Sequence, residues 1–221
     1  MDFYDFAVGP LLWISFLVFL IGSFLRVALF FYVSSQKDKA IYRYFSWKYV
    51  LATIGRWLFP FNKDVGKNPV FTILAYVFHI CLLVVPIWFS GHISLWEESR
   101  FEWSWRSIPD SFAHWMTIVL LGTVIFFLLR RIISPEVRLI STASDYLLLV
   151  VTALPFLTGY FLTHGTLDSV GFIGDNMMLI HILSGELMLL LIPFTKLSHF
   201  VLFFLSRGAT AIEFGRRGYS I

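Results

Sequence analysis

Residues 10–33 read PLLWISFLVFLIGSFLRVALFFYV, and this stretch decides the fold. Arg26 is the one charged side chain in it. At about 1.5 Å rise per residue, a helix of this length crosses the roughly 30 Å hydrocarbon core of a bilayer. The stretch lacks the basic start and the small-residue cleavage site of a secretory signal. We therefore expect it to remain in the mature protein as a membrane-spanning helix.

Comparable apolar runs recur along the rest of the chain. Of its 221 residues, 58% are hydrophobic and only 14% are charged, whereas about a quarter of the residues of a soluble domain are charged. The sequence predicts an all-α fold, a single domain over residues 1–221 that forms a membrane bundle of five transmembrane helices. The lone cysteine, Cys81, excludes a disulfide framework and a cysteine-ligated iron–sulfur cluster within this chain. The five expected spans are residues 10–33, 70–90, 112–129, 145–163 and 176–205.

The basic residues are distributed unevenly among the connections between these spans. Residues 37–67, 130–138 and 207–217 together hold 13 of the 17 Lys and Arg residues. Connections rich in Lys and Arg stay on the cytoplasmic side of a membrane. We therefore expect the N-terminus outside and the C-terminus in the cytoplasm, an orientation that requires an odd number of spans. The predicted location is the prokaryotic cytoplasmic (inner) membrane, with a multi-pass topology.

The first cytoplasmic connection contains AIYRYFSWKYVLATIGRWLF, residues 40–59. Aromatic and aliphatic residues alternate there with basic ones at near-helical spacing. Such a segment is typical of a helix that lies in the membrane interface, with its cations on lipid headgroups. Two interpretations stay open: a helix that contacts membrane lipid alone, or a docking surface for a cytoplasmic subunit.

Four of the six histidines fall in the second and fifth spans or at their ends. His79 and His92 belong to the second, and His181 and His199 to the fifth. Ionisable side chains are costly in a bilayer and usually mark function. One such histidine can simply bond a neighbouring helix, but two on each of two helices favour the axial ligation of haem iron by paired imidazoles.

The depth of each histidine predicts the pairing. His92 and His181 lie in the outer half of the membrane, and His79 and His199 lie in the inner half. The 18 residues from His181 to His199 make five turns, so both rings should face one side of a continuous helix. On a continuous helix, the 13 residues from His79 to His92 would make the two side chains point in directions that differ by roughly 140°. Either a kink at Pro86 or a place for His92 beyond the helix end would account for that difference.

The stretch IHILSGELMLLLIPFTKLSHF, residues 180–200, carries a family resemblance. It resembles the last helix of the gamma subunit, a cytochrome b, of respiratory nitrate reductases: His181, Gly185, the run Pro193–Leu197, and His199 at the same 18-residue spacing. The Phe-His and Gly-His pairs that end at residues 79 and 92 are similar too, although their spacing is longer here. The Ser-Asp-Tyr at 144–146 and the Thr-Gly at 158–159 look more like related membrane subunits of heterodisulfide-reductase-like and sulfite-reduction-associated complexes.

The resemblance implies a membrane-anchoring cytochrome b subunit with two b-type haems. His92 and His181 would ligate the outer haem iron, and His79 and His199 the inner one. Such a subunit oxidises menaquinol or ubiquinol and passes the electrons to the cytoplasmic iron–sulfur and catalytic subunits of a respiratory complex. Terminal catalysis then belongs to the partner, and no nucleic acid is expected among the partners.

Other polar or small residues in the spans have two interpretations each. Gly185 would allow close approach of a porphyrin or of a helix. Arg26 and Lys196 would meet haem propionates or extend to the membrane surface. Glu186 would bond a neighbouring helix or handle protons.

The outer surface is the predicted quinone site, because hydrogen-bonding side chains gather there near water. The expected contacts are Gly91, His92, Arg106 and His164, with ordinary exposed loop residues as the alternative. Two other function classes stay open. One is a cytochrome b that serves a different dehydrogenase, such as a hydrogenase or formate dehydrogenase, against which the 18-residue pair argues. The other is a colourless, non-haem membrane scaffold.

Overall fold

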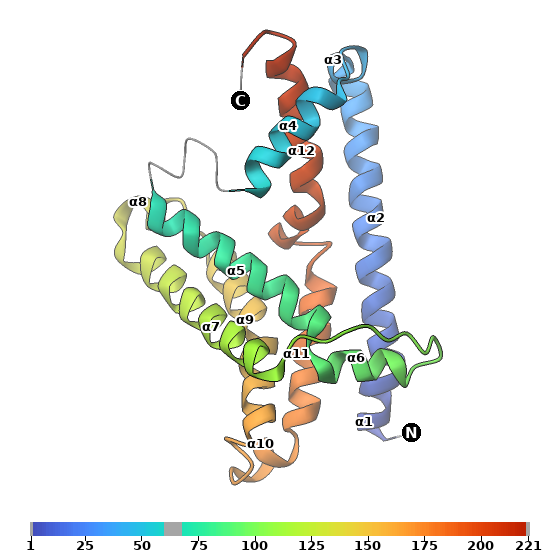
Figure 1. The fold of residues 1–221 in the computed structure, drawn as a ribbon, viewed down its shortest axis with the longest axis vertical. Coiled ribbons are helices and arrows are strands. Elements are labelled where there is room, and N and C mark those ends of the chain that lie inside the picture. Colours follow the sequence, from blue (N-terminus) through green and yellow to red (C-terminus); the bar gives the residue numbers. More distant parts are fainter. Residues whose placement is uncertain (1, 60–67, 220–221) are drawn as a thin grey trace. The chain divides into compact units, whose positions relative to one another are not determined.

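The computed structural model describes residues 2–59 and 68–219, and every regular element in those residues is a helix (Figure 1). The expectation of an all-helical fold is confirmed for this part of the chain. Lys63 and Lys67, two of the basic residues used to predict orientation, lie outside the described residues. The helices in chain order are α1 Phe3–Phe6, the π-helix η1 Ala7–Leu11, α2 Leu12–Lys37, α3 Lys39–Arg43, α4 Trp47–Leu58, α5 Pro69–Trp88, α6 Ser90–Glu97, α7 Asp110–Ile133, α8 Pro135–Leu139, α9 Ala143–His164, α10 Gly171–Asp175, α11 Met177–Leu191, the 3₁₀ turn η2 Lys196–Ser198 and α12 His199–Gly215.

Several of these helices are long and apolar enough to cross a membrane. Four unbroken stretches qualify: Phe3–Lys37, Pro69–Trp88, Asp110–Ile133 and Ala143–His164. A fifth span is possible if Met177–Leu191 and Lys196–Gly215, which are bent by 74° relative to one another, cross as one broken helix. The described residues thus fit a multi-pass membrane protein with four or five spans.

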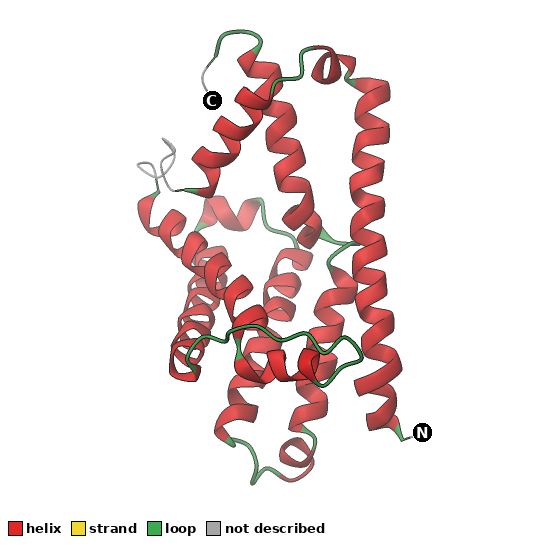
Figure 2. Ribbon diagram, turned by 45° about the vertical axis from the view of Figure 1, so that its right-hand side comes forward, coloured by secondary structure: helices red, strands yellow, loops and turns green. Residues whose placement is uncertain are grey.

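The chain divides into two compact units, and α11 runs from one into the other. The terminal unit comprises Met1–Lys67 and Glu186–Ile221, and the central unit comprises Asn68–Gly185. Figure 2 shows the helices in red and the loops between them in green.

The core of the central unit lies between α5, α7 and α9. Along α5, Phe78, Cys81 and Val85 are buried at a spacing of three and four residues, which places them on one helix face. Aliphatic, aromatic and small residues of the other two helices pack against that face. Those buried partners are Met116, Leu120, Val124, Ala153 and Phe156.

In the terminal unit, α4 packs along α12 through small residues. A methyl group on Gly215 would lie 2.5 Å from Cγ of Tyr49, so only glycine allows this approach. The Arg207 guanidinium lies 3.8 Å from the centre of the Trp57 ring, a cation–π contact between the same two helices.

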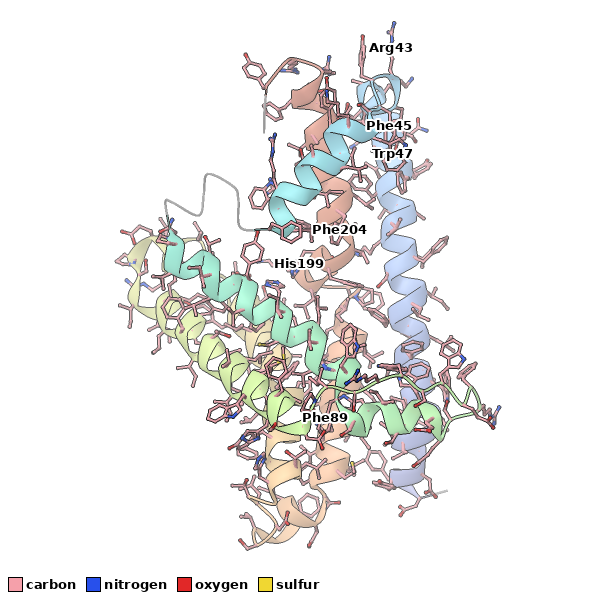
Figure 3. The ribbon with its side chains drawn as sticks, in the orientation of Figure 1. Arg43, Phe45, Trp47, Phe89, His199 and Phe204 are labelled. Atoms are coloured by element: carbon pink, nitrogen blue, oxygen red, sulfur yellow. The ribbon has the colours of Figure 1, made fainter. Side chains whose placement is uncertain are left out.

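The predicted interfacial helix at 40–59 is divided in the structure. Helix α3 ends at Arg43 and α4 begins at Trp47, with Ser46 in an extended conformation between them. Arg43, Phe45 and Trp47 project from this corner (Figure 3). Its location at a membrane surface stays a prediction.

Helix α5 ends two residues after Pro86. Phe89 is extended (φ −71°, ψ 134°), and α6 begins at Ser90. The carbonyls freed by this break are bonded: Trp105 Nε1 donates to Ile87 O at 2.9 Å, and the Ile108 N–H donates to Trp88 O at 3.0 Å. His92 therefore lies beyond the end of α5, on a separate helix, and the 140° difference from His79 no longer applies.

The prediction of one continuous helix over residues 176–205 is wrong. Helix α11 ends at Leu191, and α12 leaves in a direction 74° away. Pro193 has no N–H to continue the ladder, and the Thr195 side chain caps the next turn by accepting from the Leu197 N–H at 3.2 Å. Arg26 Nε donates to the Pro193 carbonyl at 2.6 Å. His181 and His199 are thus on different helices, and the five-turn argument for their common direction fails.

Candidate functional site

Within the central unit, the structure brings together the imidazoles of His92 on α6 and His181 on α11. Their ring centroids lie 6.0 Å apart and their planes differ by 2°. This separation exceeds a face-to-face contact. Two metal–imidazole bonds of about 2 Å each, with the ring radii added, give a centroid separation of about 6 Å. The centroid separation of the two rings is therefore compatible with both imidazoles binding one metal ion.

Hydrogen bonds fix which ring nitrogen of His92 can bind a metal. Its Nδ1 lies 3.0 Å from the carbonyl oxygen of Pro86, and because a carbonyl only accepts, Nδ1 must carry the proton. The lone pair is then on Nε2. Burial lowers the pKa of the His92 imidazole, which keeps the ring in the neutral form that a metal requires.

His181 is positioned by a hydroxyl chain from α9. Thr158 donates its proton to Leu154 O at 2.8 Å, so its oxygen accepts from His181 Nδ1 at 3.1 Å. Ser184, one turn further along α11, contacts the same Thr158 oxygen at 3.1 Å and donates to His181 O at 2.7 Å. The second imidazole is therefore held in the same tautomer as the first, with Nε2 as its acceptor.

Gly159 allows the imidazole of His181 to approach α9. A methyl group at Gly159 would lie 3.0 Å from Cε1 and 3.4 Å from Nδ1 of the His181 ring. In the sequence, Thr158 and Gly159 indicate only a family resemblance, and their contacts with the His181 imidazole are visible only in the structure. The adjacency of the two residues in an apolar span was the available signal.

The donor set of the described residues fits an axial pair better than a bare metal ion. No group of three or more His, Cys, Asp or Glu side chains gathers there in a way that could hold a metal. A bare zinc-like ion takes three or four protein ligands. A porphyrin supplies the in-plane nitrogens itself, so two imidazoles suffice.

The second predicted pair shares the same local geometry. His79 Nδ1 lies 2.7 Å from Ala75 O, and His199 Nδ1 lies 2.9 Å from Lys196 O. His199 stands at the start of α12 (Figure 3). His79 belongs to the central unit and His199 to the terminal unit, and their pairing stays a prediction.

Gly185 has open space beside it. A methyl group built there meets no atom within 4 Å among the described residues. The explanation of Gly185 by close approach of a helix stays a prediction. So does its explanation by a porphyrin.

The two cations predicted to meet propionates are placed differently. Arg26 is half-buried and bonds the Pro193 carbonyl, so it does not simply extend to the membrane surface. Lys196 is exposed in η2, at the break between α11 and α12.

The residues predicted to bind quinone lie on three segments of the chain. His164, at the end of α9, packs its ring 4.3 Å from both His114 and Tyr160. Arg106 is exposed in the segment between α6 and α7. Gly91 adjoins His92 on α6, and a methyl group there would lie 3.0 Å from the Phe89 ring. In the described residues no hydrogen bond or ring contact joins His164 or Arg106 to His92.

Comparison with known proteins finds a relative over nearly the whole chain. A protein of Nitratidesulfovibrio vulgaris (strain Hildenborough) is 35% identical to this chain, over 97% of it and 95% of the relative. The chain belongs to the family of this protein. The relative's name, "Protein", states no ligand or activity, and no protein-family model matches the chain.

Proposed function

We propose that this protein is a membrane-anchoring cytochrome b subunit with two b-type haems, which transfers electrons between a quinol and a cytoplasmic iron–sulfur subunit. One observation carries the proposal: the parallel rings of His92 and His181, 6.0 Å apart. Two neutral imidazoles so arranged, each with its Nδ1 proton engaged, would each offer Nε2 to the iron of one haem.

The residues of this chain bind and orient, while the haem when bound supplies the one-electron chemistry. Pro86 O and Thr158 Oγ1 hold the His92 and His181 rings so that each Nε2 is the ligand. The open space beside Gly185 would accept the face of the porphyrin.

The second haem would be held in the inner half of the membrane by His79 and His199. The break at Pro193 supports this assignment, because α12 begins at His199 and places that imidazole independently of His181. Arg26 and Lys196 would neutralise the propionates of the haems, since buried or interfacial carboxylates need cationic partners.

Quinol oxidation is assigned to the outer face, with Gly91, His92, Arg106 and His164 as its contacts. A quinol gives up two electrons and two protons on becoming a quinone. The stacked His114–Tyr160–His164 cluster supports the assignment, because the exposed imidazole of His164 can accept those protons and pass them to water. With the basic connections in the cytoplasm, the electrons would move inward to the iron–sulfur and catalytic subunits of a respiratory complex in the prokaryotic inner membrane.

A reduced-minus-oxidised spectrum of the purified full-length protein tests the proposal. We expect two low-spin b haems per chain, and loss of about one equivalent in His181→Ala and in His92→Ala. His164→Ala is the matched control, because its Nδ1 also lies close to a carbonyl, Tyr160 O at 2.8 Å, while its ring packs on other aromatic rings. Two haems in all three variants, or a colourless protein, would refute the proposal.

A further inference from the structure

Glu186 on α11 is the buried ionisable side chain for which the proposed electron transfer has no use. It is 2% exposed, and neither carboxyl oxygen has a hydrogen-bond partner in the described part of the chain. An ionised carboxylate so placed would lose its hydration and gain no donor or counter-charge, which strongly favours the protonated form.

Ser15 on α2 has the same unusual state. Ser15 is fully buried, and its hydroxyl has no hydrogen-bond partner among the described residues. The hydroxyl oxygen of Ser23 is also buried and without a partner, although the residue as a whole is 8% exposed. Hydroxyls in apolar helices usually donate to a carbonyl one turn back, as Thr117 and Thr152 do here. Ser15 lacks that bond, so its hydroxyl is available to another partner.

The contact between α2 and Pro193 sets a register in which Ser15 and Glu186 fall at the same level, without a hydrogen bond between them. A methyl group on Gly22 would lie 2.6 Å from Pro193 Cβ, so the two chains touch at this point. Ser15 precedes Gly22 by seven residues, and Glu186 precedes Pro193 by seven. In a helix seven residues return to within about 20° of the same direction and rise about 10 Å. The Ile192 N–H still donates to Met188 O, so this register extends to the end of α11.

Charged groups near Glu186 are engaged elsewhere or face away. Arg26 lies on the same face of α2, but its Nε donates to Pro193 O. His181 lies five residues before Glu186 on α11, a rotation of about 140°, and contacts Thr158. Within the described residues no cation pairs with the Glu186 carboxyl.

We propose that Glu186, with Ser15 at the same level, is a protonation site inside the membrane domain. The carboxyl carries a proton in the resting protein, and the Ser15 hydroxyl, itself unbonded among the described residues, is the polar group that faces it. The site binds a proton whether or not haem is present, so it goes beyond the proposed electron transfer.

An apolar carbodiimide, dicyclohexylcarbodiimide, tests the protonation state in the full-length protein in detergent at pH 7. The protonated carboxyl adds across a carbon–nitrogen double bond, its oxygen to carbon and its proton to nitrogen, and acyl migration gives a stable N-acylurea. We expect at least tenfold more modification at Glu186 than at Glu213, which Arg216 and Arg217 hold in the ionised form. Equal modification of the two, or none at Glu186, would overturn the proposal.

Infrared spectroscopy tests the partner. The carboxylic C=O band that shifts in D₂O should disappear in Glu186→Gln, persist in Glu186→Asp and change frequency in Ser15→Ala. Ser35→Ala is the control on the same helix, because that hydroxyl already donates to Tyr32 O at 2.7 Å, and should leave the band unchanged. A band that survives Glu186→Gln, or that Ser15→Ala leaves unmoved, contradicts the proposal.

Discussion

Replacing Gly159 with alanine perturbs the proposed outer haem site through one methyl group. That methyl would lie 3.0 Å from Cε1 and 3.4 Å from Nδ1 of His181, closer than an ordinary carbon contact. The ring must shift by a few tenths of an ångström, and the shift strains its 3.1 Å hydrogen bond to Thr158. Both effects move the imidazole out of its parallel alignment with His92.

The size of the effect follows from the cost of adding a methyl group to a packed site. Such overpacking costs typically about 1–3 kcal/mol. If the whole cost falls on the ligated state, affinity for the outer haem drops about 5- to 150-fold, since 1.4 kcal/mol is a factor of ten. The inner haem should be unaffected, because its proposed ligands are His79 and His199 and not His181.

The assay is titration of haem into the haem-depleted, full-length protein, monitored by its absorbance. Gly122→Ala is the matched control, because a methyl there meets nothing within 4 Å among the described residues of the bundle. It should bind haem as the parent does and gain about 0.5–1 kcal/mol of helix stability. If Gly159→Ala binds both haems within twofold of the parent, or if Gly122→Ala loses as much, the reasoning is wrong.

Three further outcomes are expected. Gly185→Ala should lower haem occupancy without lowering the melting temperature of the haem-free protein, since the protein alone has room for the methyl; unchanged haem content would remove Gly185 from the site. Gly22→Ala should lower the free energy of unfolding by about 1–3 kcal/mol, and with it the melting temperature, because the added methyl group meets Pro193 at 2.6 Å. Gly55→Ala, where the methyl group has open space, should not lower it. Equal melting temperatures for the two variants would contradict the contact. A reporter fused after Ile221 should be active only as a cytoplasmic type, and activity of an exported reporter would reverse the predicted orientation.

Composition and hydropathy were enough to predict the helices but not their breaks. An apolar run of 18 or more residues has few alternatives to a membrane helix, because backbone groups in lipid must bond internally. The predicted spans accordingly overlap the observed ones, including 145–163 against Ala143–His164. Where a helix stops inside such a run depends on contacts between distant residues.

Two prolines illustrate why contacts between distant residues determine where a helix ends. Pro155 lies inside α9, and the helix continues through it to His164. Pro193 ends α11, because Thr195 caps a new turn and Arg26, 167 positions away in sequence, takes the freed carbonyl. The proline is visible in the sequence in both cases. The partner that makes a break stable in an apolar environment is visible only in the fold.

Of the candidate site, the proximity of one histidine pair could be predicted from the sequence, and the hydrogen bonds that hold the two rings could not. Depth in the membrane was enough to predict the pairing of His92 with His181, and the structure brings these two rings together. The bonds to Pro86 O and Thr158 Oγ1 could not be predicted, because they depend on how α5 ends and how α9 meets α11.

The two helix breaks also change what the histidine spacings mean. On a straight α5, His92 would point roughly 140° away from His79, and one helix could not present both rings toward the same partner. The break at Phe89 removes that constraint and lets α6 orient His92 toward His181. On a straight fifth span, His181 and His199 would be forced to share a direction, but the 74° bend lets α12 place His199 separately. In the proposed function, each haem is then ligated by imidazoles whose directions are set independently. A variant that restored a continuous helix across Pro193 should therefore disturb the inner haem and spare the outer one.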